Sequence, residues 1–149
     1  MPEETPKPVQ KPPVHIVMQW AGENRFDAGR PGRPTIRIDG GSATGPGPID
    51  TLLSALAACT SEDVLGILAK RKTPVGALRV EGTGVRANAI PARVVSIDLT
   101  YHIDGPGIEA DQAQRAVQLA VEKYCSVRNT LDPAMPVTCH VVLNGANLA

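Results

Sequence analysis

The sequence predicts an α+β fold in which antiparallel sheets pack on two long helices. Segments in which apolar and polar residues alternate are typical of half-buried strands, and they lie on both sides of a long apolar segment, 48–70. A second segment with helical spacing, 109–124, lies between two later alternating segments. The expected order is β-β-α-β-β-α-β, without the strict β-α-β alternation that is typical of parallel sheets.

Length and composition indicate one folded domain with a short tail. The chain has 149 residues, and 42% of them are hydrophobic, which is enough for a core. Residues 1–13 contain five prolines and no periodic apolar pattern, which predicts a disordered Pro-rich tail. The expected organisation is therefore this tail followed by a single domain over 14–149.

Short strands are expected before the long helix. Alternating apolar residues predict a strand over 14–20, and a short return strand begins at 25–26 after a turn. Residues 35–39, with the sequence TIRID, form another short strand that has its two isoleucines on one face. Arg37 lies on the opposite face of that strand and so does not belong to the apolar layer.

The segment 48–70 is the strongest helix prediction. Pro48 suits a first helical turn, and Asp50 in that turn is favoured by the helix dipole. Residues 54–59 are small or apolar nearly all the way round, which predicts a central, buried helix. Pro74 ends the segment.

The second half of the chain alternates between strand and helix patterns. Apolar alternation predicts strands over 78–85, which glycines interrupt, and over 95–103. Apolar residues at spacings of three and four predict a helix over 109–124. A loop over 129–136 then leads to a last strand, 137–143.

Charge and composition exclude several classes of partner. Lys plus Arg number 15, as do Asp plus Glu, so no basic patch favours nucleic acid or an anionic membrane. Aromatic residues make up only 3%, too few for a platform that stacks bases. No run approaches 18 apolar residues, and the first residues have no apolar signal core, so we expect a cytoplasmic protein without a membrane segment.

The three cysteines are the candidates for chemistry. Cys59 lies in the middle of the long helix, and a packed thiol is the simplest interpretation of it. Glu62 and Asp63 follow one turn later and disfavour a thiolate, so a reactive Cys59 needs a cation. Cys125 follows the second helix, where the helix dipole opposes a thiolate and suits a resolving cysteine better than a first attacker. Cys139 shares the apolar face of the last strand, which indicates a structural role.

Metal binding is not expected. The cysteines are 66 and 14 residues apart, with no C-x-x-C pair and no paired histidine. No Gly-rich phosphate loop is present either, so we expect neither a metal nor a cofactor.

A family resemblance connects two of the cysteines. The stretch PIDTLL at 48–53, followed by AAC ending at Cys59 and by KYCSV around Cys125, resembles the OsmC/Ohr family of thiol peroxidases. The strand RIDG at 37–40 is similar to a family strand that carries an arginine. The resemblance covers about residues 14–145 and includes the order of the elements.

The resemblance implies an intertwined homodimer that reduces organic hydroperoxides, with a dithiol as reductant. It implies that Cys59 is the peroxidatic residue and Cys125 the resolving one. Arg37 is the implied cation and Asp50 its acidic partner, and Arg25 is the reserve cation because other members use the first hairpin. Asp50 lies nine residues before Cys59, which is about 180° around an unbroken helix. It therefore reaches the arginine only if the helix starts after it or if the arginine comes from a partner chain.

Two functions follow. The first is a thiol-dependent peroxidase that cycles through a Cys59–Cys125 disulfide. The alternative is a non-enzymatic dimer on the same scaffold that responds to redox conditions or binds a small ligand, which the two carboxylates beside Cys59 favour.

Overall fold

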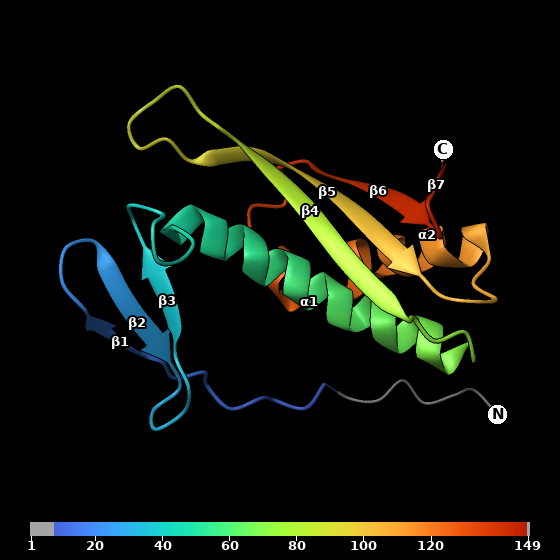
Figure 1. Ribbon diagram of the computed structural model, residues 1–149, viewed down its shortest axis with the longest axis horizontal. Coiled ribbons are helices and arrows are strands. Elements are labelled where there is room, and N and C mark those ends of the chain that lie inside the picture. Colours follow the sequence, from blue (N-terminus) through green and yellow to red (C-terminus); the bar gives the residue numbers. More distant parts are fainter. Residues whose placement is uncertain (1–7, 149) are drawn as a thin grey trace. The chain divides into compact units, whose positions relative to one another are not determined.

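The structure is a computed structural model that describes residues 8–148. The chain forms two compact units, Met1–Pro48 and Ile49–Ala149 (Figure 1). Residues 8–13 form no helix or strand and their side chains are exposed, and the rest of the predicted tail lies outside the described residues. The single domain over 14–149 stays a prediction.

The first unit is a three-stranded antiparallel sheet. Its strands are β1 (Val17–Trp20), β2 (Arg25–Gly29) and β3 (Ile36–Asp39), in the order β1-β2-β3. The three predicted strands are confirmed, although β1 begins three residues later than its alternation suggested. The register pairs Trp20 with Phe26 and Asp27 with Arg37.

Asp39 holds the loop that follows β3. Its carboxylate is 4% exposed and accepts hydrogen bonds from the backbone N–H groups of Gly41 and Thr44 and from the Thr44 hydroxyl. These donors favour the charged form and lower the pKa of Asp39 from 3.8 to about 2. The Asp39 carboxylate therefore accepts hydrogen bonds from loop N–H groups that have no neighbouring strand to donate to.

This arrangement predicts an acid-sensitive loop. Because the folded pKa lies below the ordinary value, the stabilisation is present above pH 3.8 and is lost as the pH falls toward about 2. We expect the fluorescence of Trp20, the one tryptophan of the chain, to report an acid transition in that window. Asp39→Asn should remove most of the pH dependence between these values, whereas the exposed Asp132→Asn should leave it unchanged.

The long helix α1 spans Pro48–Lys70, the bounds that the sequence predicts. Its inward stripe follows a spacing of four residues: Leu56, Thr60, Val64 and Leu68. The rest of the helix is less covered than its composition suggested, since Ala55, Ala58 and Leu65 are exposed in the single chain. The prediction that the segment 54–59 is buried all round is therefore wrong for one chain.

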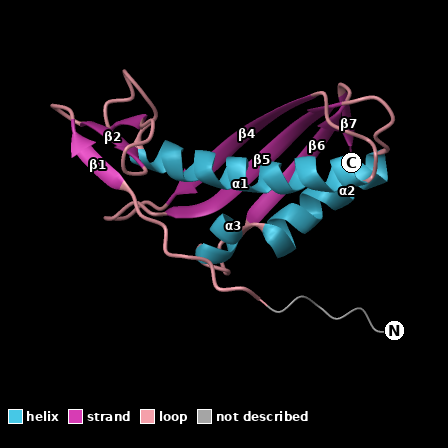
Figure 2. Ribbon diagram, turned by 90° about the horizontal axis from the view of Figure 1, so that it is seen from below, coloured by secondary structure: helices cyan, strands magenta, loops and turns pink. Residues whose placement is uncertain are grey.

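The second unit places its helices on one face of a four-stranded sheet (Figure 2). The strands are β4 (Ala77–Arg86), β5 (Val94–Asp104), β6 (Val137–Leu143) and β7 (Ala146–Leu148), in that order across the sheet. The core lies between this sheet and the helices. Its fully buried members include Leu56, Leu68, Leu99, Tyr101 and Ile103.

The sheet is mixed, so the prediction of antiparallel sheets is only partly right. β4–β5 and β6–β7 are antiparallel, whereas β5 and β6 are parallel. The physical reason is the connection between β5 and β6, which carries a helix over the sheet face and returns the chain in the same direction. The β-α-β unit was present in the predicted order of elements, but that order does not say which strands are neighbours.

The second predicted helix is not one long α-helix. α2 covers Ala110–Leu119 and continues into η1, a π-helical turn over Ala120–Tyr124, in which the N–H of Cys125 donates to the carbonyl of Ala120 at 2.9 Å. A short helix, α3 (Ser126–Thr130), follows in what was predicted as the approach to a loop. Single π turns occur frequently at functional sites, and this one ends at the second candidate cysteine.

Two glycines in β4 lie at points of close packing, and one of them, Gly84, faces α1. A Cβ added at Gly84 would lie 3.2 Å from Leu53 Cδ1 and 3.4 Å from Val94 Cγ1, and one at Gly82 would lie 3.1 Å from Leu99 Cδ2. The glycines that appeared to interrupt the strand pattern are therefore sites of close packing.

Gly84→Val should destabilise the protein by about 1–3 kcal/mol, because the extra methyl groups overpack the contact with Leu53. The measurement is the midpoint of urea unfolding. Thr83→Val is the control, because Thr83 is exposed on the same strand and its substitution should change stability by less than about 0.5 kcal/mol. Equal effects at both positions would contradict the packing role of Gly84.

α1 also meets a membrane-span criterion that a count of consecutive apolar residues misses. Among the described residues, it is the one helix that is long and apolar enough to cross a membrane by length and composition. The core helix of a soluble protein passes the same test, and one face of α1 packs on the sheet.

Candidate functional site

The structure brings Cys59 and Cys125 together. Cys59 lies in the middle of α1 and Cys125 lies between η1 and α3, and the two thiols lie close enough for Cys59 to affect the pKa of Cys125, although 66 residues separate them in the chain. Both residues belong to the core region, Cys59 half-buried and Cys125 buried. Two neighbouring thiols are the arrangement that a reversible disulfide requires.

Cys125 is held in its thiol form. Burial raises its pKa to about 11, and the neighbouring Cys59 thiol acts in the same direction. Backbone N–H groups of Arg128 and Val127 oppose the shift, and the N–H of Arg128 lies 3.3 Å from Cys125 Sγ. Cys125 is therefore the N-cap residue of α3 as well as the residue after η1, whereas the sequence pattern predicts only a helix C-terminus at this position.

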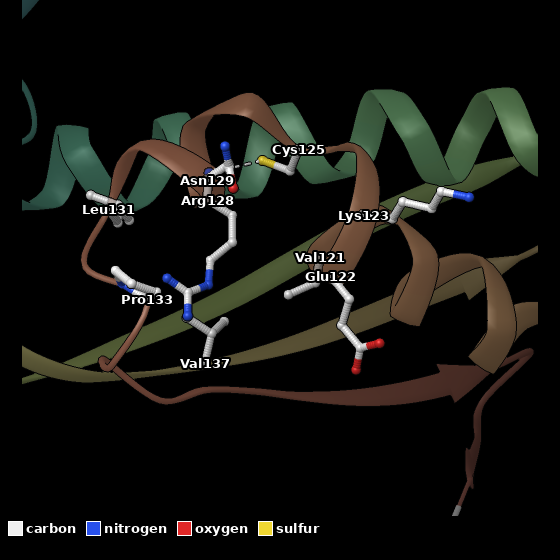
Figure 3. Close-up of a pocket in the computed structure, with 9 residues that line it drawn as sticks. All are labelled: Val121, Glu122, Lys123, Cys125, Arg128, Asn129, Leu131, Pro133 and Val137. Atoms are coloured by element: carbon white, nitrogen blue, oxygen red, sulfur yellow. Dashed lines mark hydrogen bonds between the residues drawn. The ribbon is translucent and has the colours of Figure 1, made fainter. Parts of the chain in front are cut away.

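A cavity of about 270 Å³ opens at Cys125 (Figure 3). We call it the Cys125 pocket, and its walls are Val121, Glu122, Lys123, Cys125, Arg128, Asn129, Leu131, Pro133 and Val137. Figure 3 shows the Arg128 guanidinium reaching toward Pro133 and Val137, whereas the Lys123 side chain points away from the sulfur. The guanidinium donates to the carbonyls of Asp132 and Met135 at 3.0 and 2.8 Å, which fixes the loop and places a positive charge in the pocket.

A buried hydroxyl pair lies next to the thiols. Thr60 follows Cys59 in α1, and its hydroxyl is 2.6 Å from the Tyr101 hydroxyl of β5. Burial raises the pKa of Tyr101, so the phenol stays protonated and links α1 to the sheet. The pair fixes the rotation of α1 at the turn that carries Cys59.

Neither Thr60 nor Tyr101 is distinguished in the sequence. A threonine within a helix and a tyrosine in an alternating strand are ordinary at such positions. The one available signal is that Thr60 falls on the inward stripe of an otherwise apolar helix.

Cys139 is a packed thiol, as its place on β6 predicts. It pairs with Leu99 in the sheet register and packs against the core. Burial raises its pKa to about 11, and the charges of Asp98 and Glu122 add to the shift. An uncharged thiol of this kind is unreactive at neutral pH.

Glu62 and Asp63 do not stand alone beside Cys59. Both line a cavity of about 460 Å³ together with Lys70 and Arg71 from the end of α1 and with Tyr124. The positive charges of Lys70 and Arg71 therefore lie near these two carboxylates. They offset part of the negative charge that would disfavour a thiolate at Cys59.

Arg37 is engaged within the first unit. Its guanidinium binds Asp27 with two hydrogen bonds, 2.6 Å from Nε to Oδ1 and 3.1 Å from a terminal nitrogen to Oδ2, and a third bond reaches Thr44. Asp27 faces Arg37 in the β2–β3 register, so this carboxylate orients the guanidinium. The placement of Arg37 near Cys59 stays a prediction, as does the reserve role of Arg25, whose side chain donates to the carbonyl of Gly22 at 3.4 Å.

Asp50 lies inside α1, because the helix begins at Pro48. It lines a cavity of about 200 Å³ with Leu53, Ala57 and Val80. On this unbroken helix Asp50 and Cys59 lie about half a turn apart in rotation. The first of the two conditions for Asp50 to serve the thiol, a helix that starts after it, is therefore not met.

The residues that the structure describes include no group of three His, Cys, Asp or Glu side chains placed to hold a metal ion. The nearest arrangements are pairs on the outer face of the sheet: His140 lies 3.1 Å from Asp98, and His102 lies 3.7 Å from Glu81.

Known proteins share this arrangement of elements. A family model described as OsmC-like protein matches residues 40–140. Protein YhfA of Escherichia coli K12 is 34% identical over 104 residues, which is 69% of this chain and 78% of that protein.

Solved structures agree with the fold. The OsmC-like protein of Mycoplasma pneumoniae superposes with a TM-score of 0.76 at 20% identity, over 90% of this chain and 99% of that chain. The organic hydroperoxide resistance protein OhrB of Bacillus subtilis gives a TM-score of 0.57 at 15% identity, over 85% of this chain and 96% of that chain. The family match covers more than half of the sequence, and the chain belongs to the OsmC-like family.

Proposed function

We propose that this protein is a thiol-dependent peroxidase that reduces organic hydroperoxides through a Cys59–Cys125 disulfide. The observation that carries the proposal is the proximity of the two cysteines in the core across 66 residues of sequence. The likeness of the fold to that of the organic hydroperoxide resistance protein OhrB of Bacillus subtilis supports the choice of oxidant.

The first step is attack by the Cys59 thiolate on one oxygen of the hydroperoxide. The S–O bond forms as the O–O bond breaks, the alcohol leaves with a proton, and Cys59 becomes a sulfenic acid. A guanidinium stabilises the thiolate and the departing oxygen, and Arg37, with Arg25 in reserve, is the proposed source.

The second step is attack by Cys125 on the Cys59 sulfur. The S–S bond forms as the S–O bond breaks, and the Cys125 proton leaves with the hydroxyl as water. Because its pKa is about 11, Cys125 carries this proton until the sulfenic acid is present. A thiol that stays protonated suits a resolving residue and argues against Cys125 as the first attacker.

We further propose that the active form is a homodimer. α1 leaves Leu52 and Leu65 37% and 41% exposed, and Ala55 and Ala58 on the same helix are exposed as well. A second copy is the natural cover for an apolar helix face, and in a dimer the arginine comes from the partner chain. Asp50 then binds an arginine that the partner chain supplies, which is the second of the two conditions under which it can serve the thiol.

The site favours an organic hydroperoxide with an apolar substituent over hydrogen peroxide. Apolar residues of α1, among them Leu52 and Leu53, precede Cys59, and a second copy adds more apolar surface. A dithiol restores the two cysteines, and we place the protein in the cytoplasm, where such reductants are kept reduced.

The test is consumption of cumene hydroperoxide by the purified protein with a dithiol, beside the same assay with hydrogen peroxide. We expect multiple turnovers with the organic peroxide and a lower kcat/KM with hydrogen peroxide. Loss of no more peroxide than the dithiol removes by itself would overturn the proposal and favour the non-enzymatic alternative.

A further inference from the structure

We infer that Thr60 and Tyr101 are positioning residues for the disulfide step, because their hydroxyl pair holds Cys59 in the orientation that meets Cys125. The inference rests on the two-thiol site of the proposed function, but it does not depend on a peroxide as the oxidant. It also gives a role to a polar pair that lies between the apolar faces of α1 and the sheet.

The inward stripe of α1 needs a directional contact to fix the rotation of the helix. Its other members, Leu56, Val64 and Leu68, are fully buried aliphatic side chains. The hydrophobic effect is non-directional, so such a stripe tolerates a small rotation of the helix on the sheet. A hydrogen bond weakens steeply when it is bent. The Thr60–Tyr101 bond, 2.6 Å long, therefore ties one point of α1 to one point of β5.

Counting protons assigns the donor of this bond. The Thr60 hydroxyl lies 3.0 Å from the carbonyl of Leu56 and 3.1 Å from that of Ala57. Carbonyl oxygens only accept, and a hydroxyl has one proton to donate. Thr60 therefore donates to its own helix, and Tyr101 donates to Thr60. Burial raises the pKa of Tyr101, so this donor keeps its proton at the pH at which thiols react.

The anchored residue is the direct neighbour of Cys59. Successive residues of an α-helix are rotated by about 100°, so the direction in which Thr60 points sets the direction of Cys59. Cys125 is held by a separate hydrogen bond, which the N–H of Arg128 donates to its sulfur at 3.3 Å. A disulfide accepts only a narrow range of Cβ–Cβ distances, about 3.5–4.5 Å. Two independent anchors thus keep the two thiols in the orientation that pairing requires.

Stability alone does not account for a hydroxyl pair at this depth. Thr60 and Tyr101 are both fully buried, and replacing both partners of a buried hydrogen bond by apolar groups of the same shape is often nearly neutral. A satisfied polar pair in a core instead specifies one arrangement of the elements around it. The arrangement specified here is the one that brings Cys59 to Cys125.

The experiment measures the equilibrium between the reduced protein and its Cys59–Cys125 disulfide in glutathione buffers. The two protein thiols are oxidised to a disulfide, while one oxidised glutathione takes up their electrons and protons and becomes two reduced glutathiones. Samples are quenched with acid, blocked with N-ethylmaleimide and mapped by mass spectrometry. Tyr101→Phe should lower the equilibrium constant for this disulfide about tenfold or more, because a helix free to rotate populates the pairing geometry less. Thr60 keeps its helix carbonyls in this variant, so no buried group is left unpaired.

Two further variants separate positioning from a general loss of stability. Thr60→Ser keeps the hydroxyl and should stay within about twofold of the wild-type constant, because the hydrogen bond to Tyr101 remains. Ile103→Val removes one buried methyl group from the same strand, and should lower stability while leaving the constant within about twofold. A Tyr101→Phe constant within twofold of the wild type would overturn the inference. So would an equal fall in Thr60→Ser or in Ile103→Val.

The peroxide assay distinguishes a failure of the inference from a failure of the proposed function. A wild type that forms the disulfide in glutathione but does not consume cumene hydroperoxide would contradict the proposed function, while the inference stands. A wild type that turns over cumene hydroperoxide while Tyr101→Phe keeps the wild-type constant would contradict the inference, while the proposed function stands. A wild type that forms no Cys59–Cys125 disulfide at any ratio of oxidised to reduced glutathione would overturn the inference as well.

Discussion

Cys59→Ser is expected to lower the peroxidase rate about a thousandfold or more, because a serine hydroxyl is not ionised at neutral pH and does not attack the peroxide oxygen. Cys125→Ser is expected to behave differently. Its Cys59 still reacts once, so the variant should consume about one peroxide per chain and then accumulate a sulfenic acid. The measurement is peroxide consumption over time, with a dimedone label to detect the sulfenic acid.

The third cysteine supplies the matched control. Cys139 is a packed thiol that contributes to the core, so Cys139→Ser should keep the turnover number of the wild type even if it lowers stability. A loss of turnover at Cys139 as large as that at Cys59 would contradict the assignment of the two-thiol site. So would sustained multiple turnover by Cys125→Ser with the same dithiol.

Leu65→Glu is expected to raise the dimer dissociation constant about a hundredfold or more, because it places a carboxylate on the apolar face of α1 that we assign to the partner copy. The wild type should sediment at twice 15.7 kDa at micromolar concentration, and the variant at one chain mass. Peroxidase activity should fall with the dimer, since the arginine is proposed to come from the partner.

Ile90→Glu controls for the general effect of adding a charge to an exposed apolar position. Ile90 is fully exposed in the loop between β4 and β5, so this change should alter neither the dimeric state seen in sedimentation nor the peroxidase activity. A wild type that sediments as a monomer would contradict the dimer and the route by which Asp50 reaches its arginine.

Local patterns predicted the elements that are stabilised by their own sequence. α1 has the expected bounds because Pro48 starts it and because its inward residues recur every four positions. The strands β4, β5 and β6 follow their alternation closely, since each has one face against the core.

Contacts between distant segments decided what the sequence did not predict. The parallel pairing of β5 with β6 depends on which strands are neighbours, which a local pattern does not contain. The five-residue helix α3 is held by Cys125 at its start and by the two hydrogen bonds of Arg128 to the following loop. The π turn differs from an α-helix only by one residue in each hydrogen bond, so the same apolar spacing fits both.

In the candidate site, too, some features could be predicted from local sequence and others depend on strand pairing. Its two cysteines could be named from the sequence because the resemblance supplied the pair and the helix patterns supplied their positions. The partner of Arg37 could not, because Asp27 faces it through the β2–β3 register, a relation that depends on strand pairing and not on spacing along one element.

The central claim is that peroxide joins Cys59 to Cys125, and intact-mass and peptide mapping test it most directly. One equivalent of cumene hydroperoxide is added to the reduced protein without a reductant, and the remaining thiols are blocked before digestion. The account predicts a chain lighter by two hydrogens, a crosslinked peptide pair containing Cys59 and Cys125, and a free, alkylated Cys139. A crosslink through Cys139, or a chain that keeps three free thiols while the peroxide persists, would contradict it.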